Sequence, residues 1–278
     1  MATTRPKAPI ETEAALAPAR TSPAPGDSYV QSFARGLEVI RSFSAQSSRQ
    51  TLTEVAGRTG LTRAGARRIL LTLQTLGYVD SDGKLFRLTP RMLDLGFAYL
   101  SSLPIWNLAE PVMEALVGQI KESCSAAVLD ATDIVYVLRV PTHKIMSISL
   151  GVGSRLPAYC TSMGRMLLSA LPPDDMRRVL QASDRVARTR YTVTDADELA
   201  VKIAQVRKQG WSLVNQELEE GLVSIAAPIT DRAGQTVAAL NISGQANRSS
   251  AKVMQETMLP PLLAAAQSIS SRLAKQRS

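Results

Sequence analysis

Between Thr51 and Leu88, the apolar residues recur twice at helical spacing and then alternate over two short runs. Val55 and Ala56 predict the apolar face of a first short helix, which Thr53 can cap. Gly60 follows as the residue that ends this helix, because glycine adopts a left-handed conformation at little cost. A short helix, a glycine turn, a longer helix and a hairpin, in this order, predict a winged helix-turn-helix.

The longer helix of this motif begins after Thr62, which can cap it, and ends at Gly77. The hairpin pairs residues 78–79 with residues 85–88 around an Asp-Gly dipeptide at Gly83, which is typical of a tight turn. This hairpin is the predicted wing, and Leu61 is expected to fill the turn between the helices. The buried face of the longer helix is expected to consist of Ala66, Ile69, Leu70, Leu73 and Leu76.

The segments on either side of the motif differ in pattern. Residues 1–28 are rich in Ala, Pro, Thr and Ser without apolar periodicity, so we expect a disordered tail. Residues 44–50 are polar and predict a loop. Thr89-Pro90 opens a largely apolar helix, which is expected to pack on the same helix of a second subunit. A further helix before the motif is predicted from the apolar stripe of Phe33, Leu37, Ile40 and Phe43.

From residue 104 onward, helical and strand patterns are interspersed, which favours helices packed on one antiparallel sheet and an α+β domain. A domain of this size can contain a ligand pocket. The expected domains are a tail (1–28), a winged helix-turn-helix (29–89), a linker helix (90–103) and the α+β domain (104–278). Strands are expected over 125–129, 134–140, 145–150, 211–215, 222–228 and 236–243, and helices over 111–122, 162–170, 172–180, 194–208 and 251–275.

The positive charge is concentrated in the predicted helix-turn-helix. Residues 30–91 hold ten Arg and Lys against four Asp and Glu, a net of +6 out of +8 for the whole chain. A basic helix-turn-helix indicates duplex DNA as partner, with Arg63 and Arg67 near base edges and Thr62 at a phosphate. The alternative for each cation is a solvated surface charge. The candidate DNA-binding residues are Thr62, Arg63, Arg67, Arg68, Thr72, Lys84 and Arg87.

Several other classes of protein are disfavoured. Two cysteines, one histidine and no CxxC motif argue against a disulfide scaffold and a zinc site, and no cofactor is expected. Neither a secretion signal nor an apolar run of the ~20 residues that cross a bilayer is present, so a cytoplasmic protein is expected. Cys160 and His143 could form a nucleophile and base, but no third orienting group is indicated, so an enzyme is not expected.

The helix-turn-helix and two later stretches together resemble the IclR family of bacterial transcription regulators, over nearly everything after Tyr29. One stretch is GSRLPAYCTSMGRMLLSAL at residues 153–171. The other is NQELEEGLVSIAAPI at residues 215–229, followed by GQTVAALNISG at residues 234–244. The resemblance implies a GAF-like effector-binding domain and a dimer or dimer of dimers.

Three shorter segments resemble regulators of protocatechuate and 4-hydroxybenzoate breakdown within that family. They are RVPTHKIM from Arg139, RLPAYCTSMGR from Arg155 and RTRYTVTD from Arg188. This resemblance implies an aromatic carboxylate effector such as protocatechuate or 4-hydroxybenzoate.

The effector site is expected where backbone N–H groups of residues 161–164 open a helix, since such a terminus favours a carboxylate. The resemblance implies that the ligand lies against Ser224 and against Asn241 and Ser243, which share one strand face. Arg155 could supply a cation or pair with a carboxylate of its own domain. The candidate residues are Arg155, Tyr159, Thr161, Ser162, Met163, Gly164, Asn215, Ser224, Asn241 and Ser243.

These observations favour a ligand-responsive DNA-binding transcriptional regulator that controls aromatic acid catabolism. Three alternatives stay open at this point: a regulator of the same family that responds to another small carboxylic acid, an architectural DNA-binding protein without an effector, and an enzyme fused to a helix-turn-helix. Asn215 stands where members of the family often have Asp, and the loss of this negative charge near the pocket could favour an anionic effector or be neutral drift.

Overall fold

The computed structural model of the chain describes residues 26, 28–102, 105–142 and 150–275, which form two compact units. The boundary between the units lies between Leu103 and Pro104. Most of the expected tail, residues 145–149 of one expected strand, and His143 lie outside the described residues. None of the described helices combines the length and apolar character that crossing a membrane requires.

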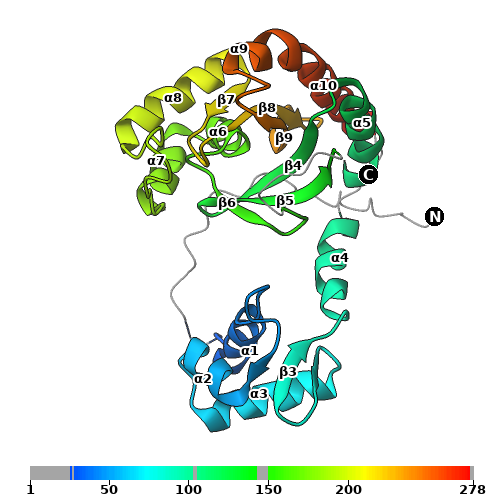
Figure 1. Cartoon of the computed structure of the whole chain (residues 1–278), viewed down its shortest axis with the longest axis vertical. Coiled ribbons are helices and arrows are strands. Elements are labelled where there is room, and N and C mark those ends of the chain that lie inside the picture. Colours follow the sequence, from blue (N-terminus) through cyan, green and yellow to red (C-terminus); the bar gives the residue numbers. More distant parts are fainter. Residues whose placement is uncertain (1–25, 27, 103–104, 143–149, 276–278) are drawn as a thin grey trace, which may run out of the picture. The chain divides into compact units, whose positions relative to one another are not determined.

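The N-terminal unit is a helical domain with a small three-stranded antiparallel sheet in the order β1-β3-β2 (Figure 1). Strand β1 was not expected, because Gln50 belongs to a polar segment. The buried Gln50 side chain donates from Nε2 to the Ser42 carbonyl oxygen at 3.1 Å, and Gln50 pairs with Phe86. The elements are α1 (Gln31–Arg41), β1 (Gln50–Thr51), α2 (Leu52–Thr59), α3 (Arg63–Thr75), β2 (Val79–Ser81), β3 (Leu85–Leu88) and α4 (Met92–Ser102).

The core of this unit is smaller than the apolar pattern predicts. Only the end of α1 meets the core, where Val39 is buried and Ile40 packs beside it, whereas Phe33 stays 69% exposed. Leu76 is 52% exposed, because it is the residue after α3 rather than part of its buried face. The predicted burial was therefore wrong for Phe33 of α1 and for Leu76. Leu70 is fully buried, as expected.

The ends of α2 and α3 are set by local hydrogen bonds. Gly60 adopts a left-handed conformation with φ of 65°, and Thr62 accepts a hydrogen bond from the Gly65 N–H at 3.1 Å, both as the sequence predicts. The cap of α2, however, is Thr51 and not Thr53. Thr51 and Glu54 form a capping box, in which the Thr51 N–H donates to the Glu54 carboxylate at 2.7 Å. This hydrogen bond lowers the pKa of Glu54.

Replacing Thr51 with alanine is expected to lower the unfolding temperature of the N-terminal unit by ~4–8 °C, as for the loss of one helix cap in a small domain. The matched change Thr53→Ala should leave this temperature almost unchanged, because the exposed Thr53 makes no recorded hydrogen bond within the described residues. Differential scanning calorimetry of the full chain measures both. Equal effects of the two changes would contradict the assignment of the cap.

The C-terminal unit is built on a six-stranded antiparallel sheet in the order β6-β5-β4-β9-β8-β7. Helix α5 begins at Ile105, before Pro111, so the predicted start at residue 111 is wrong, although proline favours a first turn. The elements are α5 (Ile105–Ile120), β4 (Ser123–Asp130), β5 (Asp133–Val140), β6 (Arg155–Pro157), α6 (Ser162–Ala170), α7 (Pro173–Ala182), α8 (Ala196–Gln209), β7 (Ser212–Asn215), β8 (Leu222–Thr230), β9 (Thr236–Gln245), α9 (Ala251–Val253), a π-helical turn (Met254–Met258) and α10 (Leu259–Lys275).

Helices cover both faces of this sheet (Figure 1). Helix α6 lies on one face, while α5 and α10 pack together against the other. Side chains alternate along β9, so Ala239 joins the apolar core under α6 and Asn241 points to the same face. Polar residues of β9 thus lie beneath the first turn of α6.

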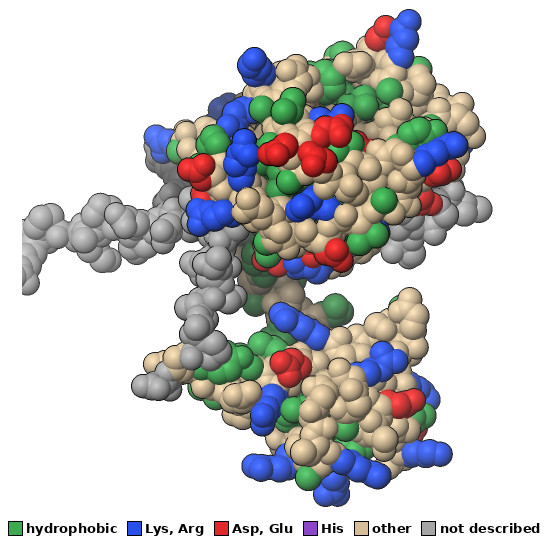
Figure 2. All heavy atoms as spheres, turned by 90° about the vertical axis from the view of Figure 1, so that its left-hand side faces the viewer, with side chains coloured by type: hydrophobic (Ala, Val, Ile, Leu, Met, Phe, Trp, Pro, Cys, Tyr) green, Lys and Arg blue, Asp and Glu red, His purple; other side chains and the backbone are tan. Residues whose placement is uncertain are grey.

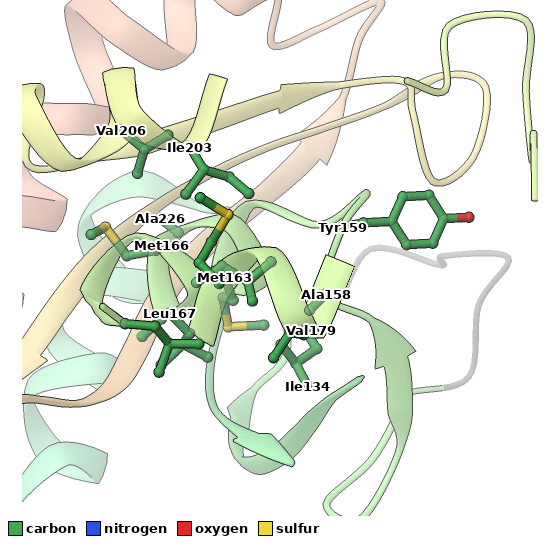
Figure 3. Close-up of a cluster of buried hydrophobic side chains, with 14 of the residues drawn as sticks. Ile134, Ala158, Tyr159, Met163, Met166, Leu167, Val179, Ile203, Val206 and Ala226 are labelled. Carbon is green, nitrogen blue, oxygen red and sulfur yellow. The ribbon is translucent and has the colours of Figure 1, made fainter. Parts of the chain in front are cut away.

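The apolar core around α6 fixes the position of that turn (Figure 3). Met163, Met166 and Leu167 of α6 are buried in one cluster with Ile203 of α8. Gly164 approaches the preceding loop so closely that an added Cβ would lie 2.2 Å from the Ala158 carbonyl oxygen. The start of α6 is therefore held between the sheet, α8 and its own incoming loop.

Candidate functional site

Helix α3 presents a basic surface that contains three arginines. Arg63 and Arg67 are four residues apart and therefore lie on one line along the helix, with Arg68 on the adjacent line. All three are exposed, and within the described residues no carboxylate pairs with any of them. Figure 2 shows Lys and Arg side chains gathered along the lower edge of the unit that contains α3. This surface suits the phosphates and base edges of a DNA groove.

The threonine hydroxyl groups Thr62 Oγ1 and Thr72 Oγ1 are already hydrogen-bonded to the backbone of this helix. Thr62 Oγ1 caps α3, and Thr72 Oγ1 donates to the Arg68 carbonyl oxygen at 2.9 Å. Sequence reasoning gave no role to Leu71, which is exposed four residues after Arg67. An exposed leucine on this line could contact a thymine methyl group, and the spacing from Arg67 is the signal that would have indicated it.

The two cations predicted for the wing differ in their surroundings. Lys84 is exposed at the tip of the hairpin after Gly83. Arg87 donates to the Asp80 carboxylate from Nη2 at 2.5 Å and from Nε at 3.1 Å, and these hydrogen bonds lower the pKa of Asp80. Arg87 is therefore engaged within the hairpin, while Lys84 is the wing cation with no ion pair in the described part of the chain.

The C-terminal unit contains a pocket between the first turn of α6 and the polar side of the sheet. About 30 Å³ of it admits the centre of a water-sized sphere, and its empty volume reaches about 510 Å³ only when the part that is open to solvent is counted. Of the candidate effector residues, the pocket is lined by Thr161, Ser162, Met163, Ser224, Asn241 and Ser243. The structure thus brings together the helix start and the strand pair that the sequence indicated.

Two buried polar atoms in this pocket have no hydrogen-bond partner within the described residues: Ser162 Oγ and Asn241 Oδ1. The other end of the Asn241 amide donates to Ser243 Oγ at 3.0 Å. A buried polar group without a partner costs roughly 1–3 kcal/mol, so each such group in a folded protein needs an explanation, and a bound ligand is one. A ligand that hydrogen-bonds to both atoms would remove this cost.

The first turn of α6 adds backbone donors to the pocket. Thr161 Oγ1 accepts from the Gly164 N–H at 3.2 Å and donates to the Pro157 carbonyl oxygen at 3.0 Å. The N–H groups of Ser162 and Met163 have no acceptor within the helix, as in any first helical turn. This end of the pocket therefore offers partial positive charge and hydrogen-bond donors.

Sequence reasoning missed the contribution of β5. Tyr136 and Arg139 both line the pocket although they are three residues apart, a spacing that normally places side chains on opposite faces. A register shift between Ala126 and Ala127 of β4 inserts an extra residue in β5 and returns both side chains to one face. Burial raises the pKa of Tyr136 to about 12. The other missed lining residues are Leu150, Cys160, Val214, Leu218 and Leu222.

Four candidate effector residues lie outside the pocket lining, and two of them, Arg155 and Tyr159, have other partners. Arg155, at 45% exposure, pairs with carboxylates of its own domain: Nη1 with Asp130 at 2.6 Å and Nε with Asp133 at 3.2 Å. Tyr159 is buried and donates from its hydroxyl to the Val186 carbonyl oxygen at 2.6 Å. Both side chains therefore have structural partners.

Asn215 and Gly164 contribute to the site only indirectly. Asn215 is exposed, and its neighbour Val214 lines the pocket opposite Ser224. Because strand side chains alternate, Asn215 faces away from the pocket that Ser224 lines. Gly164 permits the close packing of α6 on Ala158 rather than lining the pocket.

A buried ion pair holds one wall of the pocket. Arg165 of α6 donates to both carboxylate oxygens of Glu217, at 2.7 Å and 2.5 Å, and Glu217 also accepts from the Val193 N–H at 3.1 Å. Both side chains of the pair are at most 9% exposed. The pair fixes the loop after β7, whose next residue, Leu218, lines the pocket.

Cys160 does not have the properties of a catalytic nucleophile. Burial raises the pKa of its thiol to about 11, so the thiol stays protonated near neutral pH. The suggested base, His143, lies outside the described residues.

Comparison with known proteins gives consistent matches along the chain. A model of the IclR helix-turn-helix domain matches residues 32–83, and a model of the bacterial transcriptional regulator IclR C-terminal region matches residues 97–271. The Pca regulon regulatory protein of Pseudomonas putida is 44% identical over 88% of this chain and 84% of its own length.

Two solved structures extend the comparison. A transcriptional regulator from Rhodococcus sp. RHA1 is 49% identical, with a TM-score of 0.79 over 88% of this chain and 99% of its own. A double mutant of the PobR inducer-binding domain from Acinetobacter, solved with 3-hydroxybenzoic acid, is 30% identical, with a TM-score of 0.56 over 59% of this chain and 97% of its own. With both family models matched in order, this chain belongs to the IclR family of bacterial transcriptional regulators.

Proposed function

We propose that this protein is a ligand-responsive regulator of aromatic acid catabolism, which binds an aromatic carboxylate such as protocatechuate or 4-hydroxybenzoate. The pocket under α6 carries this proposal, because its lining combines one cation, two buried polar atoms that have no partner among the described residues, and several apolar side chains. Leu150, Met163 and Leu218 offer apolar contacts to a ring. The similarity to the inducer-binding domain solved with 3-hydroxybenzoic acid supports the same ligand class.

The DNA-binding half of the proposal rests on α3 and the wing. We propose that Arg63 and Arg67 contact bases or phosphates in the major groove, that Thr62 and the N-terminus of α3 meet a phosphate, and that Lys84 contacts the adjacent backbone. Arg68, Thr72 and Arg87 border the same surface. We propose that this protein acts on operator DNA in the cytoplasm.

A second copy of the chain is the proposed protein partner, in a dimer or a dimer of dimers. No residue of α4 is buried within the single chain, and Leu93 and Phe97 are 73% and 69% exposed. Exposed apolar surface of this extent marks an interaction site. A dimer would also place two copies of α3 on two half-sites about one helical turn apart, or a multiple of that.

A thermal-shift screen tests the effector. At 100 times the dissociation constant, 4-hydroxybenzoate or protocatechuate should stabilise the protein by roughly 2.7 kcal/mol, which raises its unfolding temperature by several degrees. 4-Hydroxybenzyl alcohol, which keeps the ring and its hydroxyl but lacks the carboxylate, is the matched control for 4-hydroxybenzoate and should give a much smaller shift.

The other outcomes distinguish the alternatives. A shift with non-aromatic carboxylic acids alone would favour a regulator of another pathway. No shift with any acid, together with DNA binding that does not depend on sequence, would favour an architectural protein. Conversion of an added acid, measured by chromatography, would indicate an enzyme.

A further inference from the structure

Arg139 is the one charged side chain among the described residues that line the pocket. These residues include no Asp or Glu, and the Arg139 side chain forms no hydrogen bond or ion pair within the described part of the chain. This differs from Arg155, on the neighbouring strand, which two carboxylates engage. A guanidinium without a partner at a pocket wall is available to bind an anion, with a fork of donors that matches a carboxylate.

The register of the sheet places Arg139 opposite the two unpaired polar atoms. Arg139 pairs with Ser125 of β4, and Ser125 pairs with Asn241 of β9. Residues that pair directly across an antiparallel sheet share one face, so Arg139 and Asn241 point to the same side, two strand spacings or about 10 Å apart. Their side chains therefore mark two ends of the pocket.

The chemistry of these ends differs. Asn241 Oδ1 is an acceptor without a donor, and its amide nitrogen is already directed to Ser243. A carboxylate has no proton to offer this oxygen, whereas a ring hydroxyl does. Arg139, in contrast, carries a full positive charge, compared with roughly half a charge at a helix N-terminus such as that of α6.

We propose that Arg139 binds the carboxylate of the aromatic effector and that Asn241, together with Ser162, binds a hydroxyl on the opposite side of the ring. This assignment rests on the proposed function and gives the ligand an orientation. It reverses the orientation that the helix start alone suggests, in which the carboxylate lies against the first turn of α6. A para-hydroxylated ring acid fits this arrangement.

Isothermal titration calorimetry of the full chain tests the orientation with two ligands of the same shape, 4-hydroxybenzoate and its neutral amide, 4-hydroxybenzamide. Arg139→Gln should weaken binding of the acid by ~10–100-fold, as for loss of a charged hydrogen bond, and change binding of the amide by less than about threefold. Arg139→Lys should restore part of the affinity for the acid. The matched control Arg155→Gln should change neither ligand by more than about threefold.

The other end of the pocket has its own test. Asn241→Ala should reduce the preference for 4-hydroxybenzoate over benzoate and leave the preference for acid over amide intact.

Three results would overturn the assignment. Unchanged affinity for the acid in Arg139→Gln would show that this residue does not bind the carboxylate. Equal losses for acid and amide would show a structural role. If the unaltered protein binds none of these aromatic compounds, the proposed function fails together with the assignment, and this result is separate from the other two because it needs no variant.

Discussion

Replacing Arg67 with alanine is expected to abolish specific operator binding and to leave effector binding unchanged. Arg67 lies on the exposed line of α3 with Arg63 and has no carboxylate partner in the described residues, so its guanidinium is free to contact DNA. One bidentate base contact contributes roughly 1–3 kcal/mol. If the chain binds DNA as the proposed dimer, two such contacts are lost, which corresponds to a weakening of roughly 30-fold to more than 10⁴-fold.

Fluorescence anisotropy measures this effect on a duplex that the unaltered protein selects from a random library. Arg177→Ala is the matched control, because Arg177 is an exposed arginine of the C-terminal unit that pairs with Asp197. The Arg67 variant should also show a weaker dependence on salt if the contact is to phosphate, and a relaxed preference at one base pair if it is to a base. Unchanged affinity would remove Arg67 from the interface.

Replacing Gly164 with alanine is expected to destabilise the C-terminal unit strongly and to prevent effector binding. The added Cβ would lie 2.2 Å and 2.3 Å from the carbonyl oxygen and Cα of Ala158, far inside any tolerated contact. Both atoms belong to the backbone, so relief requires that α6 move away from the loop. Overpacking of this kind costs typically 1–3 kcal/mol, and more where backbone must shift.

Gly118 of α5 provides the matched control, since nothing lies within 4 Å of an added Cβ there. Gly118→Ala should stabilise the protein by roughly 0.5–1 kcal/mol through helix propensity alone. Thermal unfolding and effector titration of both variants check the prediction. A Gly164 variant that is as stable as the unaltered protein would contradict the close packing of α6 on Ala158.

The parts that sequence predicts well are those that local chemistry decides. Gly60 and Thr62 fix the turn of the helix-turn-helix through their own backbone and side chain, so a few neighbouring residues are enough to locate it. The period of two along β9 likewise places Asn241 and Ser243 on one face, and both line the pocket.

The parts that sequence predicts poorly depend on distant partners. Tyr136 and Arg139 share a face only because of an irregularity in the pairing of β4 with β5, and that pairing is not encoded locally. Leu218 reaches the pocket because Glu217 pairs with Arg165, 52 residues earlier in the chain. Arg155 carries the charge expected of a ligand contact, but only the structure shows that two carboxylates already engage it.

The bare surface of α4 has a consequence for how much of this protein a cell must contain. A helix of 11 residues with no buried side chain has only marginal stability in water on its own. Its stability therefore depends on the surface that packs against it. If a second copy provides that cover, mass action links the order of α4 to the amount of protein present. At low abundance the segment that joins sensing to DNA binding would loosen first, and the response to effector would then depend on expression level as well as on ligand.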